Sequence, residues 1–97
     1  MTWDGTFDIP SHIVARKVED EIVILDLKAG TYFSLDPVGA RIWQHLSAGK
    51  TLSEINDLMQ EEFEVTREQI EADSLKLTND LVAKGLLKPQ GASPTRD

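Results

Sequence analysis

The side chains that could support acid–base or metal chemistry are few in this chain, and they lie far apart. It has two histidines, His12 and His45, and no cysteine, which excludes thiol nucleophiles and thiolate metal sites. Neither histidine begins an H-x-x-x-H or H-E-x-x-H pattern, and no G-x-S-x-G turn or glycine-rich phosphate loop is present. Glu61, Glu62 and Glu64 form a run that is typical of solvated charge. We interpret both histidines as surface residues and predict no enzyme, no metal and no cofactor.

Size and charge narrow the class of protein further. The 97 residues, 40% apolar and 28% charged, are typical of one small globular domain. A net charge of −7 opposes nucleic-acid binding, which depends on Lys and Arg displacing counterions from phosphates. The sequence shows neither a basic start followed by an apolar run nor a stretch of about 18 apolar residues. We therefore expect a cytoplasmic protein that binds neither nucleic acid nor membranes.

Three strands are predicted in the first half of the chain. They cover residues 11–18, 21–27 and 31–35, with a tight turn at Glu19-Asp20 and a second turn ending at Gly30. The middle segment carries apolar side chains at both alternating sets of positions, which favours a central strand. A meander then leaves the first and third strands at the sheet edges, each with a row of unpaired backbone groups.

Three helices are predicted after the strands, because three segments open with a capping signal. The signals are Asp36 before Pro37, Thr51 with Glu54, and Thr66 with Gln69. The third helix should run to Lys84 and end at Gly85 in the C′ position. The predicted fold class is α+β: a three-stranded antiparallel sheet followed by three helices, similar to a winged helix. Residues 1–11 are expected to form an arm, residues 12–88 the domain, and residues 89–97 a disordered tail.

The third helix and the third strand offer a way to bind a peptide. The helix carries an apolar sector wider than one packing partner requires, formed by Ile70, Ser74, Leu75, Leu77, Leu81 and Val82. An extended peptide can add to a sheet edge through main-chain hydrogen bonds, while neighbouring pockets select its side chains. The alternative is that Tyr32, Phe33, Leu77 and Leu81 are simply core residues. Phe33 and Leu35 share a strand face and are predicted to lie in the core.

Two other function classes remain open at this stage. A winged-helix DNA reader would present basic residues on its recognition helix, but residues 67–84 carry three basic residues against four acidic ones. A small hydrolase would need His12 or His45 as a base. We place both behind peptide recognition.

One long motif resembles a known family. Residues 30–43, Gly-Thr-Tyr-Phe-Ser-Leu-Asp-Pro-Val-Gly-Ala-Arg-Ile-Trp, are followed at matching spacing by Leu46, Gly49, Lys50-Thr51-Leu52, Glu54-Ile55, Val65, Leu77, Leu81 and Gly85-Leu86-Leu87. In these residues the chain closely resembles the PqqD-like family, over about residues 12–87. That family supplies the recognition element for ribosomally made, modified peptides (RiPPs).

The resemblance implies a function without catalysis or cofactor. The leader segment of a precursor peptide would add as a strand beside the third strand, in the groove shared with the third helix. Carried onto this chain, the peptide-binding set is Thr31, Tyr32, Phe33, Ser34, Asp73, Leu77, Asp80 and Leu81. The resemblance favours the free-standing type of lasso-peptide systems, a monomer that delivers the leader to a leader protease. A chaperone for a radical SAM enzyme, in pyrroloquinoline quinone or other RiPP maturation, is the alternative.

Overall fold

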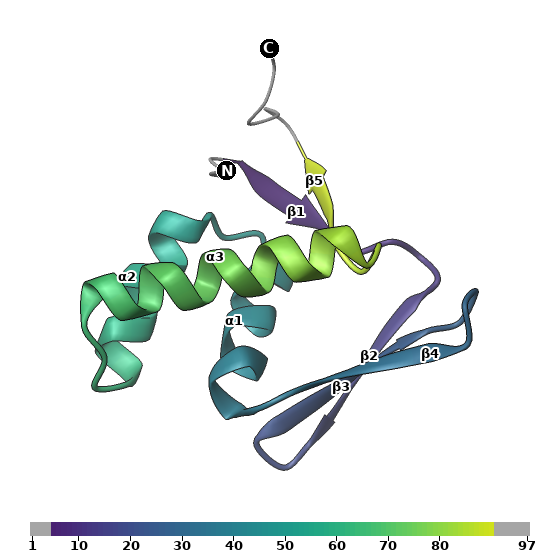
Figure 1. Ribbon diagram of the computed structural model, residues 1–97, viewed down its shortest axis with the longest axis horizontal. Helices are drawn as coiled ribbons and strands as arrows, with labels where there is room; N and C mark the ends of the chain where they lie inside the picture. The colour runs from purple at the N-terminus through teal and green to yellow at the C-terminus, as the bar shows by residue number, and fades with distance from the viewer. Residues whose placement is uncertain (1–4, 91–97) are drawn as a thin grey trace.

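The sheet and the helices follow each other along the chain as the sequence predicts. The computed structural model describes residues 5–90. Strands β2 (Ile13–Val18), β3 (Glu21–Asp26) and β4 (Thr31–Leu35) form an antiparallel sheet in the order β2-β3-β4. Helices α1 (Pro37–Ser47), α2 (Leu52–Glu62) and α3 (Arg67–Ala83) come next (Figure 1). The predicted α+β fold class and the central position of β3 are confirmed.

The two faces of the sheet differ in burial because side chains alternate along each strand. Ile22 pairs with Leu35 and Ile24 with Phe33, and these side chains face the helices. Val23 and Leu25 lie on the opposite face and are half-buried. Both hairpins use left-handed backbone at their turns, with φ of 59° at Glu19 and 73° at Gly30.

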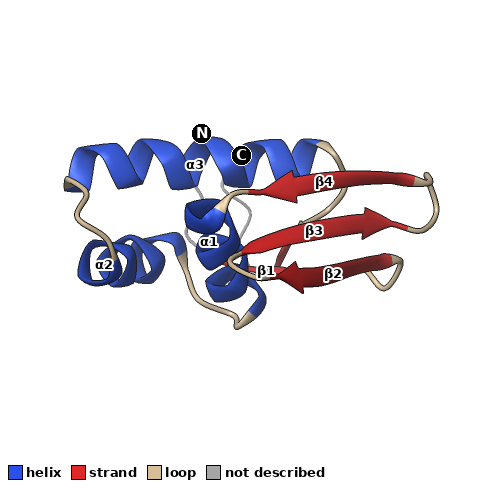
Figure 2. Cartoon of the chain, turned by 90° about the horizontal axis from the view of Figure 1, so that it is seen from below, coloured by secondary structure: helices blue, strands red, loops and turns tan. Residues whose placement is uncertain are grey.

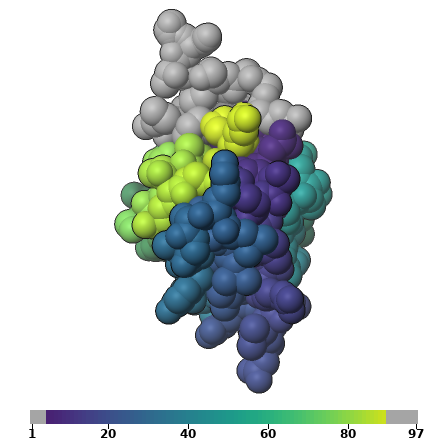
Figure 3. Space-filling view, turned by 90° about the vertical axis from the view of Figure 1, so that its right-hand side faces the viewer, coloured from purple at the N-terminus to yellow at the C-terminus, as the bar shows by residue number. Residues whose placement is uncertain are grey.

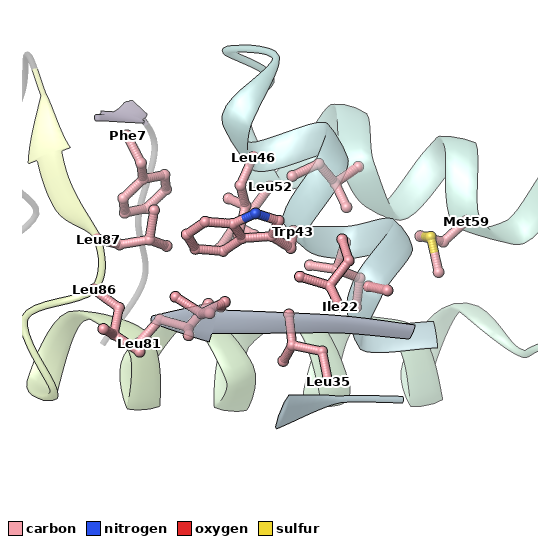
Figure 4. Packing of buried hydrophobic residues seen from close by; sticks show 14 of the residues in the cluster. Phe7, Ile22, Leu35, Trp43, Leu46, Leu52, Met59, Leu81, Leu86 and Leu87 are labelled. Atoms are coloured by element: carbon pink, nitrogen blue, oxygen red, sulfur yellow. The ribbon is translucent and has the colours of Figure 1, made fainter. Parts of the chain in front are cut away.

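The core lies between the sheet and the helices, with α1 at its centre. In Figure 2, α1 sits between the sheet and α2, while α3 runs along one side of the molecule. Three residues of α1 are almost fully buried and belong to the core cluster: Ile42, Trp43 and Leu46. Figure 4 shows Trp43 and Leu46 among residues from the sheet and the other helices. Ile42 and Trp43, the last two residues of the motif at 30–43, therefore belong to the core.

A second, two-stranded sheet joins the two ends of the described chain. Strand β1 (Thr6–Asp8) pairs antiparallel with β5 (Lys88–Gln90), with Phe7 opposite Pro89. Phe7 is buried in the core cluster that also contains Leu86 and Leu87 (Figure 4). The predicted arm thus contains a regular strand at residues 6–8. The disordered tail was expected to begin at residue 89, but residues 89 and 90 belong to strand β5. The rest of the predicted tail, residues 91–97, lies outside the described part of the chain.

The predicted helix starts are confirmed, one of them with a change. The Asp36 carboxylate accepts a hydrogen bond from the Gly39 N–H at 2.8 Å, and Thr51 and Glu54 form a complete capping box. Thr66 accepts from the Gln69 N–H at 3.1 Å, but the Gln69 side chain donates to Asp73 at 2.9 Å instead of completing a box.

The end of α3 also follows the sequence. Gly85 has a φ of 77°, and the Leu86 N–H donates to the Leu81 carbonyl at 2.9 Å. This pair of features is the Schellman pattern, which turns the chain sharply after the helix. The turn places Leu86 and Leu87 in the core and directs β5 toward β1.

Candidate functional site

A surface groove separates β4 from α3. Its volume is about 430 Å³, and both elements contribute to its walls. In Figure 2, β4 is the strand of its sheet that lies beside α3, and Figure 3 shows the blue surface of the sheet next to the yellow-green surface of α3. The lining residues are Phe33, Ser34, Leu35, Asp36, Val38, Gly39, Ile42, Val65, Asp73, Lys76, Leu77 and Asp80. The groove thus has an apolar floor and a charged rim.

The backbone of β4 presents hydrogen-bonding groups toward the open side of the sheet. The Leu27 N–H donates to the His12 carbonyl at 2.9 Å, so at this position β3 bonds toward β2. In antiparallel sheets the direction of the backbone groups alternates with each residue. The backbone groups that point toward β4 are therefore those of Ile22, Ile24 and Asp26. Their partners on β4 are Leu35, Phe33 and Thr31, whose N–H and C=O groups face β3. The N–H and C=O groups of Tyr32 and Ser34 consequently point outward, away from β3.

Residues 5–11 of the N-terminal arm do not pair with this edge. Strand β1 pairs with β5, in a sheet separate from the one that contains β4. Within residues 5–90, the single sheet partner of β4 is β3. In this part of the chain the edge and the groove beside it are open together, as strand addition requires.

The predicted residues on β4 divide between the two faces of the strand. Phe33 faces the helices and lines the groove, and the Lys84 ammonium lies 5.6 Å from the centre of its ring. Phe33 is half-buried, whereas Leu35 is buried as expected of a core residue. Tyr32 points to the opposite face of the sheet and is 72% exposed. Ser34 lines the groove, but Thr31 and Tyr32 do not.

The predicted residues on α3 are placed by their helical phase. Asp73, Leu77 and Asp80 line the groove, at the i, i+4 and i+7 spacing that defines one helix face. Leu81 has an exposed fraction of 0% and belongs to the core. Its assignment as a groove residue is therefore not supported, because position 81 is turned about 100° from position 80 around the helix.

Sequence reasoning missed several residues of the groove. These are Asp36, Val38, Gly39, Ile42 and Val65, together with Lys76 on α3. Lys76 lies three residues after Asp73, so the helical spacing alone would have found it. The others come from the start of α1 and the loop before α3, and their approach to the groove depends on tertiary packing.

A tight cluster of titratable groups on α1 and α2 lies away from this groove. The Arg41 guanidinium donates to both Glu62 carboxylate oxygens, at 2.9 and 2.7 Å, and His45 Nε2 is 3.2 Å from Glu62 Oε2. Hydrogen bonding from Arg41 lowers the pKa of Glu62. His45 is 8% exposed, so its interpretation as a surface histidine is wrong. The cluster joins α1 to α2, and this role in packing accounts for it.

The remaining polar features give no sign of chemistry. His12 is half-buried, with its Nε2 3.8 Å from the Asp26 carboxylate, which also accepts hydrogen bonds from the turn amides of Lys28 and Ala29. Among residues 5–90, no three His, Cys, Asp or Glu side chains gather as a metal site requires. No helix in that range is long and apolar enough to span a bilayer.

The fold and the groove together define a class: a small α+β domain whose open sheet edge lies beside a helix, suited to an extended peptide. The chain matches the family model described as coenzyme PQQ synthesis protein D (PqqD) over residues 21–87, more than half of its length. It therefore belongs to the PqqD family, which confirms the resemblance seen in the sequence. No curated protein matches the chain significantly.

Two solved structures are similar to this chain. One is described as TbiB1 in complex with the TbiA(beta) leader peptide. It is 40% identical, with a TM-score of 0.79, and the match covers 89% of this chain and 98% of that one. The other is described as lasso peptide synthetase B1 complexed with the leader peptide. It is 28% identical, with a TM-score of 0.78, and the match covers 86% of this chain and 98% of that one.

Proposed function

We propose that this chain is a non-catalytic recognition element of a lasso-peptide pathway, which captures the leader segment of a precursor peptide and delivers it to a leader protease. The observation that carries the proposal is the accessible edge of β4 beside an apolar groove. Both similar structures are described as complexes with a leader peptide, and one of them as a lasso peptide synthetase B1. Membership of the PqqD family agrees with this assignment.

The binding mode we propose is addition of the leader as a further strand next to β4. The outward backbone groups of Tyr32 and Ser34 would pair with the leader backbone and supply affinity with little dependence on sequence. Side chains at alternate leader positions would then point toward the helices. There they would meet the groove floor formed by Phe33, Leu77 and their apolar neighbours.

Delivery follows from tethering rather than from chemistry on this chain. A leader held on the domain raises the local concentration of the attached core peptide at the partner enzyme. We infer that the catalytic groups belong to that enzyme, because both ion-pair clusters on the described helices are occupied in joining helices. Glu62 joins α1 to α2, and Arg67 joins α3 to α2 through Asp57.

The test uses proline substitutions on the two opposite edges of the sheet. Ser34→Pro removes an outward N–H from β4 and places a ring where the added strand would lie, while the bonds between β3 and β4 are retained. Ala15→Pro is the matched control, because by the same alternation the Ala15 N–H is directed away from β3 at the β2 edge. Circular dichroism and urea unfolding establish that each variant is folded.

Binding is measured by fluorescence anisotropy with two labelled probes, the leader encoded beside this gene and the TbiA(beta) leader. Wild type and Ala15→Pro should bind alike, and Ser34→Pro should bind at least about tenfold more weakly, since a main-chain hydrogen bond is lost and the approach is blocked. Failure of the wild type to bind either leader would refute the proposed function. Weaker binding by Ala15→Pro alone would instead identify the β2 edge as the site.

A further inference from the structure

The rim of the groove carries an uneven charge. Asp36, Asp73 and Asp80 line it together with one cation, Lys76. A peptide that lies in this groove brings its own charges close to these carboxylates, where like charges repel and opposite charges attract. The charge of the rim therefore bears on which leader segments fit.

The three carboxylates differ in the ion pairs and hydrogen bonds that they already make within the protein. Asp80 is paired with Lys76, whose Nζ lies 3.6 Å from its Oδ2. Asp36 caps α1 through the Gly39 N–H at 2.8 Å. Asp73 accepts a hydrogen bond from the neutral Gln69 side chain, and none of the ion pairs among residues 5–90 includes it. Asp73 is thus the groove carboxylate whose charge is least compensated.

The surroundings of Asp73 suit a long cationic side chain. Leu77 lies one turn further along the same face of α3 and is half-buried. Lys and Arg cover apolar surface with their aliphatic stems while the charged end reaches a polar partner. A stem resting on Leu77 would bring the charge to Asp73, whose carboxylate is held in place by Gln69.

A second cation, outside the groove lining, lies near the Phe33 end of the groove. Lys84 lies over the Phe33 ring, one helical turn beyond Asp80. A basic residue in the peptide is therefore attracted at the Asp73 end and repelled at the Phe33 end. Such a difference in charge would favour one register of a bound strand, which main-chain hydrogen bonds alone do not do.

From these observations we infer that the peptide bound in this groove carries a Lys or Arg that pairs with Asp73 and covers Leu77. The inference rests on the proposed function, and it names a chemical requirement on the leader that strand addition by itself does not impose. It assigns Asp73 as a specificity-determining residue whose role depends on charge.

The experiment is a double-mutant cycle between protein and peptide. Each Lys or Arg of the leader encoded beside this gene is replaced in turn by Gln, and each peptide is titrated against wild type and Asp73→Asn by fluorescence anisotropy. One replacement should weaken binding to wild type about two- to fivefold, the range of an exposed charge pair, and should have little further effect on Asp73→Asn. The affinity of wild type for the unsubstituted leader should also fall as the salt concentration is raised.

Glu68→Gln is the control, because it removes the same charge from a different face of α3. It should leave leader affinity and its salt dependence unchanged. A leader that binds wild type but tolerates every Lys or Arg replacement, or binds Asp73→Asn and wild type equally, would overturn the inference and leave the proposed function intact. A leader that does not bind wild type at all would refute the proposed function instead.

Discussion

Replacing two leucines on α3, Leu77 and Leu81, should separate binding from stability. Leu81 has an exposed fraction of 0%. Truncating a fully buried leucine to alanine loses its transfer free energy and leaves a cavity, so Leu81→Ala should lower the free energy of unfolding by about 3 kcal/mol. Leu77 is half-buried at the groove. Leu77→Ala should cost only about 1 kcal/mol of stability, because part of its surface is already in water.

Leader affinity should respond in the reverse order. Leu77→Ala removes an apolar contact from the groove floor. The loss of about 1 kcal/mol of binding free energy corresponds to about fivefold weaker binding. Leu81→Ala should bind nearly as wild type wherever it is folded, because a small domain with about 5–15 kcal/mol of stability tolerates the loss. Urea unfolding and anisotropy titrations on the same samples measure both quantities. Equal destabilisation by the two variants, or weaker binding by folded Leu81→Ala than by Leu77→Ala, would refute this placement of the groove.

Two further predictions concern the helices. In the folded protein, hydrogen bonding from Arg41 holds the pKa of Glu62 below its usual 4.5. In acid, the unfolded chain therefore binds more protons than the folded protein does. The ionised Glu62 carboxylate contributes at most about 1 kcal/mol of stability, because Arg41 is 43% exposed. This contribution is present above pH 4.5 and is lost as pH falls through the folded-state pKa of Glu62. Glu62→Gln should remove this part of the acid sensitivity of urea unfolding; an unchanged pH profile would contradict it. Thr78 Oγ1 is buried without a hydrogen-bond partner in the described residues. Thr78→Val should therefore raise the free energy of unfolding by up to about 1 kcal/mol, and the thermal midpoint with it. A lowered midpoint would show that the hydroxyl has a hydrogen-bond partner.

The helix starts were predictable because their signals are local. Asp36 and Thr51 each bond to a backbone N–H three residues away, so a short stretch of sequence contains the whole interaction. The strands could be predicted for a similar reason, since a close hairpin turn leaves few alternative pairings. The family motif spans the β4–α1 junction, which is why it indicated the fold before any groove was known.

The β1–β5 pair could not be predicted in the same way. Each strand has three residues, too few for an alternating pattern, and Pro89 is a residue that sheets tolerate only at edges. The pair forms because Phe7 is buried beside Leu86 and Leu87, a contact between the two ends of the chain. The burial of His45 escaped prediction for a related reason, since its partner Glu62 lies on a different helix.

The groove between the third strand and the third helix was predicted at the level of elements, and its lining residues less well. The apolar sector of α3 was visible, but the sequence does not say which part of it turns toward the core. Packing against α1 and the sheet decides that Leu81 is buried and that Leu77 reaches the groove. The same packing brings Val65 and Ile42 to the groove floor, positions that carry no binding signal of their own.

The motif and the groove are linked at the junction where β4 ends and α1 begins. A Cβ at Gly39 would lie 3.2 Å from the Asp36 carboxylate and 3.4 Å from Leu35, so the absence of a side chain lets the cap close over the end of the strand. Leu35 and Ile42 on either side of this cap belong to both the core and the groove floor. Substituting them would disturb fold and binding together. Binding is therefore best tested through the outward backbone at Ser34 and the rim charge at Asp73, which contribute to the groove without filling the core.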